Sequence, residues 1–129
     1  MSRTNELPLY LAMYKLQKYL YLIIKHFPKD YKYNLGSTIL EIGWVALDCI
    51  IEVNELPNPE KRNMIGNASI AFDKLKTRLR MAYELKLISP RRYSFIIIQN
   101  TEIGSMINGW LKWAIQYSDI IKKRVKARI

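Results

Sequence analysis

Two apolar stripes lie on nearly opposite sides of one helical segment, and this pattern limits what the chain can fold into. Between residues 34 and 55, apolar residues recur at steps of four and three, the spacing of one helix face. This first stripe consists of Leu35, Ile39, Ile42, Ala46, Cys49 and Val53. The second lies roughly 150° around the helix and consists of Leu40, Trp44, Leu47 and Ile51.

A helix in a small monomeric bundle needs only one apolar face, so the second stripe must be covered by something else. The chain has 129 residues, few with which to cover it. The sequence therefore predicts that the chain is one part of a symmetric homo-oligomer. Its expected subunit interface comprises Leu40, Trp44, Leu47 and Ile51, together with Trp113 from a later helix.

Four segments show the helical period, and prolines and a polar loop separate them. The expected helices run from Pro8 to the turn at Pro28, from about Leu35 or earlier to Asn54, from Pro59 or Glu60 to about Leu87, and from Pro90 onward. Thr4 and Asn5 are possible caps of the first helix, and Ser89 is the expected N-cap of the last. The isoleucines at 96–98 would allow a short strand, but the helical context on both sides favours a helix.

The inner faces of the other three helices follow from the same spacing. In the first helix the face is Leu9, Met13, Leu16, Leu20, Ile23 and Phe27; in the third it is Met64, Ala68, Ala71, Phe72, Leu75, Leu79 and Ala82; in the fourth it is Tyr93, Ile97, Asn100, Gly104, Ile107, Leu111 and Ala114. The predicted fold is all-α, an antiparallel four-helix bundle. It forms one domain over residues 1–129, with a basic C-terminal tail from about residue 119.

Charge and composition indicate the class of partner. Lysine and arginine number 21 against 11 acidic residues, giving a net charge of +10. Such an excess suits a polyanion, nucleic acid before an anionic membrane, although a merely well-solvated basic protein has the same balance. No apolar signal region or spanning segment is evident, and a lone cysteine favours a reducing compartment. We expect a cytoplasmic protein that does not enter a membrane.

Residues capable of catalysis are few. His26 is the only histidine and Cys49 the only cysteine, so zinc-ligand spacing cannot be assembled. His26 is interpreted as a helix-end cation and Cys49 as a packed thiol. Glu41, Asp48 and Glu52 share one strip of the second helix, where ion pairing or solvation explains them better than acid–base chemistry. The sequence predicts a protein that is not an enzyme and has no metal or cofactor.

Basic residues that could bind phosphate are concentrated in three groups. Their members are Lys74, Lys76, Arg78 and Arg80 in the third helix, Arg91 and Arg92 at the start of the fourth, and Lys122, Lys123, Arg124, Lys126 and Arg128 at the C-terminus. Several cations on one surface favour phosphate binding through counterion release. A local ion pair between Arg80 and Glu84 is the alternative for part of the first group.

Three strings of sequence resemble a known family. They are FPKDYKYNLGSTI (27–39), LKTRLRMAYELKLISPRRY (75–93) and IGSMINGWLKW (103–113). The family is the four-helix bundle family that holds the accessory variability protein (Avd) of diversity-generating retroelements and the proteins encoded in 23S ribosomal RNA intervening sequences. Within these strings, Arg80 and Lys76 match basic family positions and Trp110 matches a glycine–tryptophan pair. The tail beyond Trp113 matches no family pattern.

The resemblance implies a non-enzymatic basic bundle that assembles as a ring-shaped or barrel-shaped homo-oligomer, a homopentamer. In the retroelement setting, such a protein acts with a reverse transcriptase and with RNA, and possibly DNA, during mutagenic complementary DNA synthesis. Two other hypotheses stay open: an intervening-sequence protein of the same fold, and an adaptor oligomer whose charge serves only solubility.

Overall fold

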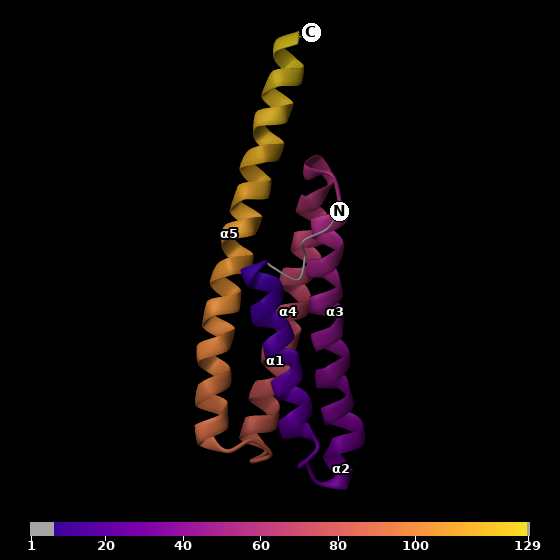
Figure 1. Cartoon of the computed structure of the whole chain (residues 1–129), viewed down its shortest axis with the longest axis vertical. Helices are drawn as coiled ribbons and strands as arrows, with labels where there is room; N and C mark the ends of the chain where they lie inside the picture. The colour runs from indigo at the N-terminus through magenta and orange to yellow at the C-terminus, as the bar shows by residue number, and fades with distance from the viewer. Residues whose placement is uncertain (1–6, 129) are drawn as a thin grey trace.

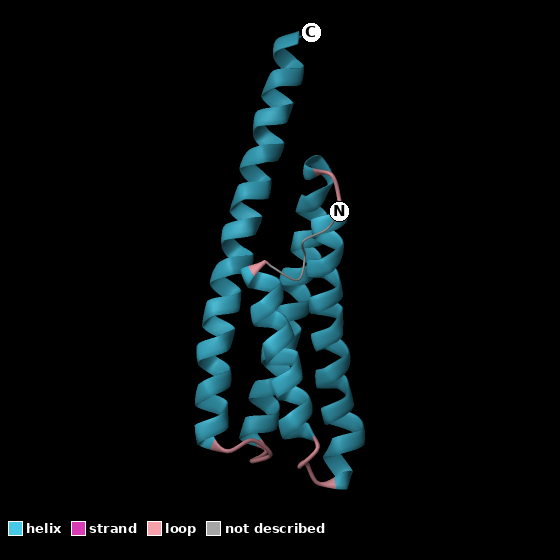
Figure 2. Cartoon of the chain, in the orientation of Figure 1, coloured by secondary structure: helices cyan, strands magenta, loops and turns pink. Residues whose placement is uncertain are grey.

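Four long antiparallel helices form the protein, and each begins or ends where proline or loop residues interrupt the helical period. The computed structural model describes residues 7–128. Its elements are α1 (Pro8–Ile24), α2 (Lys29–Tyr31), the π-helical segment η2 (Lys32–Gly36), α3 (Ser37–Glu55), the 3-10 segment η3 (Asn58–Glu60), α4 (Lys61–Glu84) and α5 (Pro90–Arg128). Figures 1 and 2 show the helices side by side, joined by short loops. The predicted all-α fold is confirmed for the described residues.

The second helix begins earlier than its apolar pattern indicates. Pro28 ends the turn after α1, and α2, η2 and α3 then follow without an intervening loop from Lys29 to Glu55. The wider π turn lies next to the buried Gly36, where an added Cβ would lie 2.8 Å from Ile24 Cγ2. The side chain of Asn34 accepts from the backbone N–H of Leu35 and donates to the carbonyl oxygen of Asp30. These contacts let the helical backbone continue through residues in which apolar side chains do not recur at the helical spacing.

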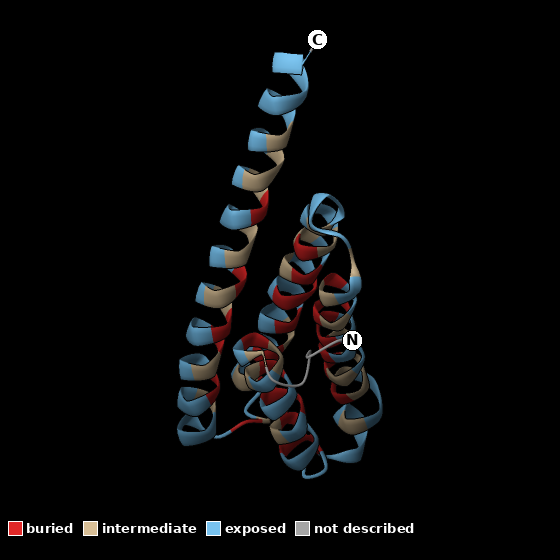
Figure 3. Ribbon diagram, turned by 45° about the horizontal axis from the view of Figure 1, so that its top comes forward, coloured by how far each residue is buried: buried red, intermediate tan, exposed pale blue. Residues whose placement is uncertain are grey.

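The core lies along the axis between the helices (Figure 3). The expected inner faces of the first and third helices are confirmed, except that Ile65 rather than Met64 is fully buried. In the fourth helix Asn100, Ile107 and Ala114 are buried as expected, but Ile96, which is 0% exposed, takes the place of Ile97, which is 43% exposed. The buried face of α5 consists of Ile96, Asn100, Ile103, Ile107 and Ala114.

The proposed outer stripe of the second helix is partly wrong. Leu47 is 1% exposed and belongs to the core of its own chain, together with Ile50, which is in neither predicted stripe. Leu40 and Ile51 are partly buried against the same core. Trp44, at 42% exposed, is the only member of the four that stays largely outside. Leu47 is therefore not available to a second subunit.

The caps only partly follow the sequence signals. The backbone N–H of Arg92 donates to Ser89 Oγ at 3.2 Å, which confirms Ser89 as the cap of α5. The possible caps Thr4 and Asn5 lie outside the described residues. α4 ends in a Schellman motif: the N–H of Leu87 donates to the carbonyl oxygen of Ala82 and the N–H of Lys86 to that of Tyr83, both at 2.9 Å.

A glycine at position 86 is expected to stabilise the fold. Lys86 is the left-handed residue of this motif, with φ of 64°, a conformation that costs a side chain with a Cβ. We expect Lys86→Gly to raise the free energy of unfolding by about 0.5–1 kcal/mol, measured by denaturant unfolding. Lys86→Ala removes the same charge but keeps the Cβ, and should give no such gain. An equal gain from both variants would assign the effect to charge.

Candidate nucleic-acid interface

The basic residues of α4 occupy two opposite flanks of the helix. Lys74 and Arg78 lie on one side of the buried stripe, and Lys76 and Arg80 lie about 160° away on the other. The guanidinium of Arg78 donates from Nη1 to the carbonyl oxygen of Lys74 at 3.2 Å, which holds the Arg78 side chain along its helix. The four cations therefore flank the buried stripe as two separate pairs.

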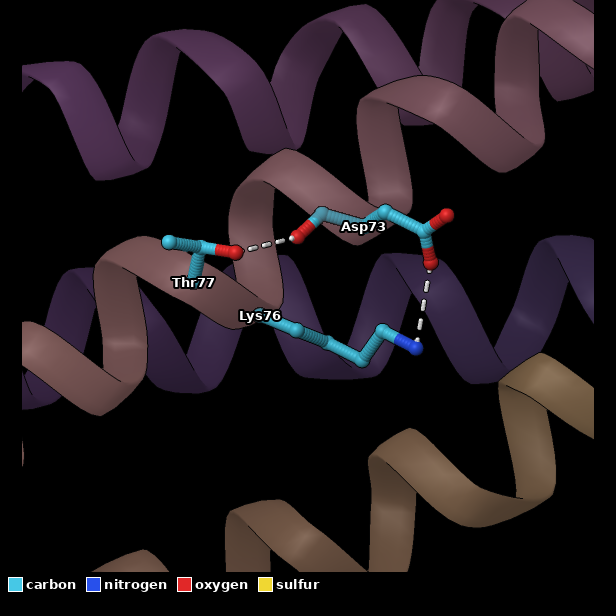
Figure 4. A network of polar contacts seen from close by, with 3 residues as sticks. All are labelled: Asp73, Lys76 and Thr77. Carbon is cyan, nitrogen blue, oxygen red and sulfur yellow. Dashed lines mark hydrogen bonds and ion pairs between the residues drawn. The ribbon is translucent and has the colours of Figure 1, made fainter.

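Lys76 lies in a small polar network on the surface of α4 (Figure 4). Its Nζ is 3.1 Å from a carboxylate oxygen of Asp73 and 5.1 Å from the ring centroid of Phe72. Thr77 Oγ1 donates to the carbonyl oxygen of Asp73 at 3.1 Å. Because the Lys76 and Asp73 side chains are 43% and 68% exposed, this ion pair is weak and leaves the ammonium accessible to a phosphate.

The expected ion pair between Arg80 and Glu84 is confirmed. Arg80 Nε donates to Glu84 Oε2 at 3.0 Å, and both side chains are mostly exposed. Glu84 balances one of the four α4 cations, as Asp73 balances another. The α4 group is therefore less cationic than its sequence indicates.

One end of the bundle gathers cations from two turns that are far apart in the sequence. The turn from α1 to α2 and the turn from α4 to α5 both lie at this end, at the bottom of Figure 1. Together they bring five exposed cations to the same end, here called the turn-end cluster: Lys25, Lys29, Lys86, Arg91 and Arg92. The tertiary fold thus joins Arg91 and Arg92 to lysines that the sequence analysis missed.

The remaining basic group lies at the opposite end. α5 has 39 residues and α4 has 24, so α5 is about 22 Å longer at 1.5 Å per residue. The C-terminal part of α5 extends beyond the other helices in Figure 1, and residues 115–128, which follow the last buried position of α5, are here called the arm. The arm carries the exposed residues Lys122, Lys123 and Arg124. The residues expected to form a C-terminal tail are helical as far as Arg128.

Aromatic side chains lie around both expected interface tryptophans. Trp44 Nε1 donates to the hydroxyl oxygen of Tyr21 at 2.9 Å, and the two rings meet edge to face at 6.5 Å. Trp113, which is 37% exposed, lies 5.6 Å from the ring of Tyr117. A hollow of about 240 Å³ beside Trp44 is lined by Tyr14, Gln17, Lys18, Tyr21, Leu22, Trp44 and Leu47. Trp44 and Trp113 are thus both available for contact with another chain.

The catalytic candidates have the positions of structural groups. Cys49 is buried, and burial, with the carboxylates of Glu52 and Asp48 adding to it, raises the pKa of the thiol. Glu41, Asp48 and Glu52 are exposed and form no ion pair within residues 7–128. In the same range, no group of three or more histidine, cysteine, aspartate or glutamate residues is placed to hold a metal ion.

Comparison with known proteins supports the resemblance carried by the three strings. Residues 10–114 match the family described as bAvd-like, which is most of the chain. The chain belongs to the bAvd-like family. No curated protein and no solved structure matches it significantly.

The match to the bAvd-like family covers α1 to the middle of α5 and ends at Ala114. It therefore includes the α4 cations and the turn-end cluster but not the arm. Within the part of the chain that the structure describes, no helix has the length and apolarity to cross a membrane.

Proposed function

We propose that this bAvd-like protein is the nucleic-acid-binding accessory subunit of a diversity-generating retroelement. In this role it is a non-enzymatic homo-oligomer, expected to be a pentamer, that acts with a reverse transcriptase and template RNA during mutagenic complementary DNA synthesis. The observation that supports it most is the family match over residues 10–114 of a chain with a net charge of +10. The family description favours the accessory-protein hypothesis over the intervening-sequence protein.

The distribution of charge supports a role in which the protein holds template RNA. Cations lie at both ends of the bundle, with further pairs on α4 between them. Arg92 and Lys123 are 31 residues apart along one continuous helix, or about 47 Å. A polyanion that contacts both regions would lie along the bundle, and its affinity would come from counterion release rather than from base recognition. The subunit would then keep template RNA near the polymerase.

Association with the polymerase is expected to depend on RNA. A reverse transcriptase is itself basic where it grips its template, so attraction between two basic proteins cannot drive binding. RNA bridging is favoured over a direct contact through Glu41, Asp48 and Glu52. Co-expression of the two proteins followed by affinity capture should recover both, and treatment with ribonuclease should release most of the polymerase.

The same capture distinguishes the other hypotheses. Retention that survives ribonuclease would replace bridging with a direct protein contact. No retention under either condition would leave the adaptor or the intervening-sequence hypothesis. A reverse transcriptase gene with template and variable repeats beside the gene for this chain would support the retroelement assignment independently.

A further inference from the structure

The inner face of α5 continues past the end of the bundle, where none of the described helices of its own chain covers it. Ile107 and Ala114 are buried, and Ile121 and Val125 follow at steps of seven and four on the same side of the helix. Val125 is 53% exposed. Figure 3 shows that buried positions on α5 stop before the arm begins. The arm thus carries an apolar seam, formed by Ile121 and Val125, that another surface can cover.

Lysines flank this seam. A shallow hollow of about 340 Å³ on the arm is lined by Ile121, Lys122, Lys123, Val125 and Lys126. Its floor is apolar, and Lys122 and Lys126 lie along its rim, about 100° around the helix from Ile121 and Val125 respectively, whereas Lys123 lies roughly 160° from both. A phosphate backbone would satisfy the rim but leave the floor exposed to water. A protein surface with apolar side chains beside carboxylates would satisfy both.

The outer face of α3 is such a surface. Glu41, Val45, Asp48 and Glu52 recur at steps of four, three and four and are all exposed. Val45 is 47% exposed, and Trp44 lies beside it. From Glu41 to Glu52 the strip is about 16 Å long, and the arm is about 20 Å long. Charge, apolar content and length all match those of the arm.

The arm cannot reach this strip within its own chain. α5 is a continuous helix that packs on α4, α1 and η3, and its arm points away from the bundle end (Figure 1). We propose that the arm of one subunit docks along the α3 outer face of a second copy, with Lys122 and Lys126 opposite Glu41 and Asp48. This inference rests on the oligomer in the proposed function. The contact joins two different patches, the kind that builds rings when its rotation closes.

Charge reversal with rescue tests the docking. Lys122→Glu with Lys126→Glu places like charges across the contact, and we expect subunit association to weaken by roughly tenfold or more. Light scattering coupled to size exclusion, at matched protein and salt concentrations, measures the mass. Adding Glu41→Lys and Asp48→Lys to the same chain restores opposite charges and should restore the oligomer. Lys15→Glu with Lys112→Glu changes net charge equally at other exposed positions and should leave the mass unchanged.

Hydrogen exchange gives a second measurement. A helix without tertiary contacts is marginal in water, so amides of residues 118–128 should be protected in the wild-type oligomer and exchange quickly in the reversed variant. A monomeric wild type, or failure of the rescue, would overturn the docking. An unchanged mass with weaker RNA binding would also overturn it and make Lys122 and Lys126 nucleic-acid contacts. RNA binding is measured separately, so its absence in an intact oligomer would contradict only the proposed function.

Discussion

Neutralising three cations of the turn-end cluster is expected to weaken binding to single-stranded RNA by roughly 100-fold at about 50 mM salt. The variant is Lys29→Gln, Arg91→Gln and Arg92→Gln, three exposed positions on two turns that meet at one end of the bundle. Each phosphate that a cation neutralises adds about 0.7 to the dependence of log affinity on log salt for single strands. The slope should therefore fall by about 2, measured by fluorescence anisotropy of a labelled RNA across a salt series.

A matched triple variant controls for net charge. Lys15→Gln, Arg62→Gln and Lys112→Gln remove three exposed cations elsewhere, and we expect a much smaller change in slope. Neutralising Lys76, Arg78 and Arg80 should also weaken binding, but by less than the turn-end variant, because these cations lie on two flanks and two of them have carboxylate partners. Equal losses in all three variants would show that only total charge matters, which contradicts a localised site. Wild-type binding that is independent of salt would contradict phosphate recognition altogether.

Gly43→Ala is expected to lower the free energy of unfolding by about 1–3 kcal/mol. Gly43 is buried where α3 crosses α1, and an added Cβ would lie 2.0 Å from Gln17 Oε1 and 2.9 Å from Gln17 Cδ. Gln17 is 2% exposed, and its Nε2 donates to the carbonyl oxygen of Leu40 at 3.0 Å. The amide must move to admit the methyl group and would lose this bond, a cost larger than the gain in helix propensity of Ala over Gly.

Two comparisons isolate this packing effect in denaturant unfolding at fixed protein concentration. Gly66→Ala and Gly109→Ala are also helical, and a Cβ there meets nothing within 4 Å, so each should stabilise the fold by about 0.5–1 kcal/mol. Gln17→Ala combined with Gly43→Ala removes the clash, and the pair should be coupled by about 0.5–3 kcal/mol. Stabilisation by Gly43→Ala alone would show that the two helices are not packed this closely.

Where α3 crosses α1, a polar residue is buried that the sequence pattern does not identify as buried. Gln17 lies one position after Leu16 in the apolar stripe of α1, where a polar residue is expected at the edge of the face. It is buried because Gly43 has no side chain and α3 can approach. Gln17 Oε1 and Asn100 Oδ1 are the buried side-chain atoms without a hydrogen-bond partner among the described residues. The spacing of the fourth helix placed Asn100 on its inner face, but the burial of Gln17 could not be recognised without the partner helix.

The helix content, the up-and-down order and the inner faces of α1 and α4 were determined by the sequence itself, because period and proline placement are local properties. Register on the neighbouring helices is not local. The run at 96–98 offers three adjacent isoleucines, and only the seating of α5 on α1 and α4 selected Ile96 over Ile97. Leu47 was assigned to an outer stripe, but α1 lies close enough to enclose it.

Functional residues also divide into those that the local sequence indicates and those that only the tertiary structure brings together. The strings that carry the family resemblance, and the Arg80–Glu84 pair at a spacing of four, are readable along the chain. The turn-end cluster is not, because more than 50 residues separate Lys29 from Lys86 and only an antiparallel bundle returns them to one end. The sequence determined how much positive charge the protein carries and on which helices. The tertiary structure alone decided where that charge is concentrated, since electrostatic fields add over distance in space and not along the chain.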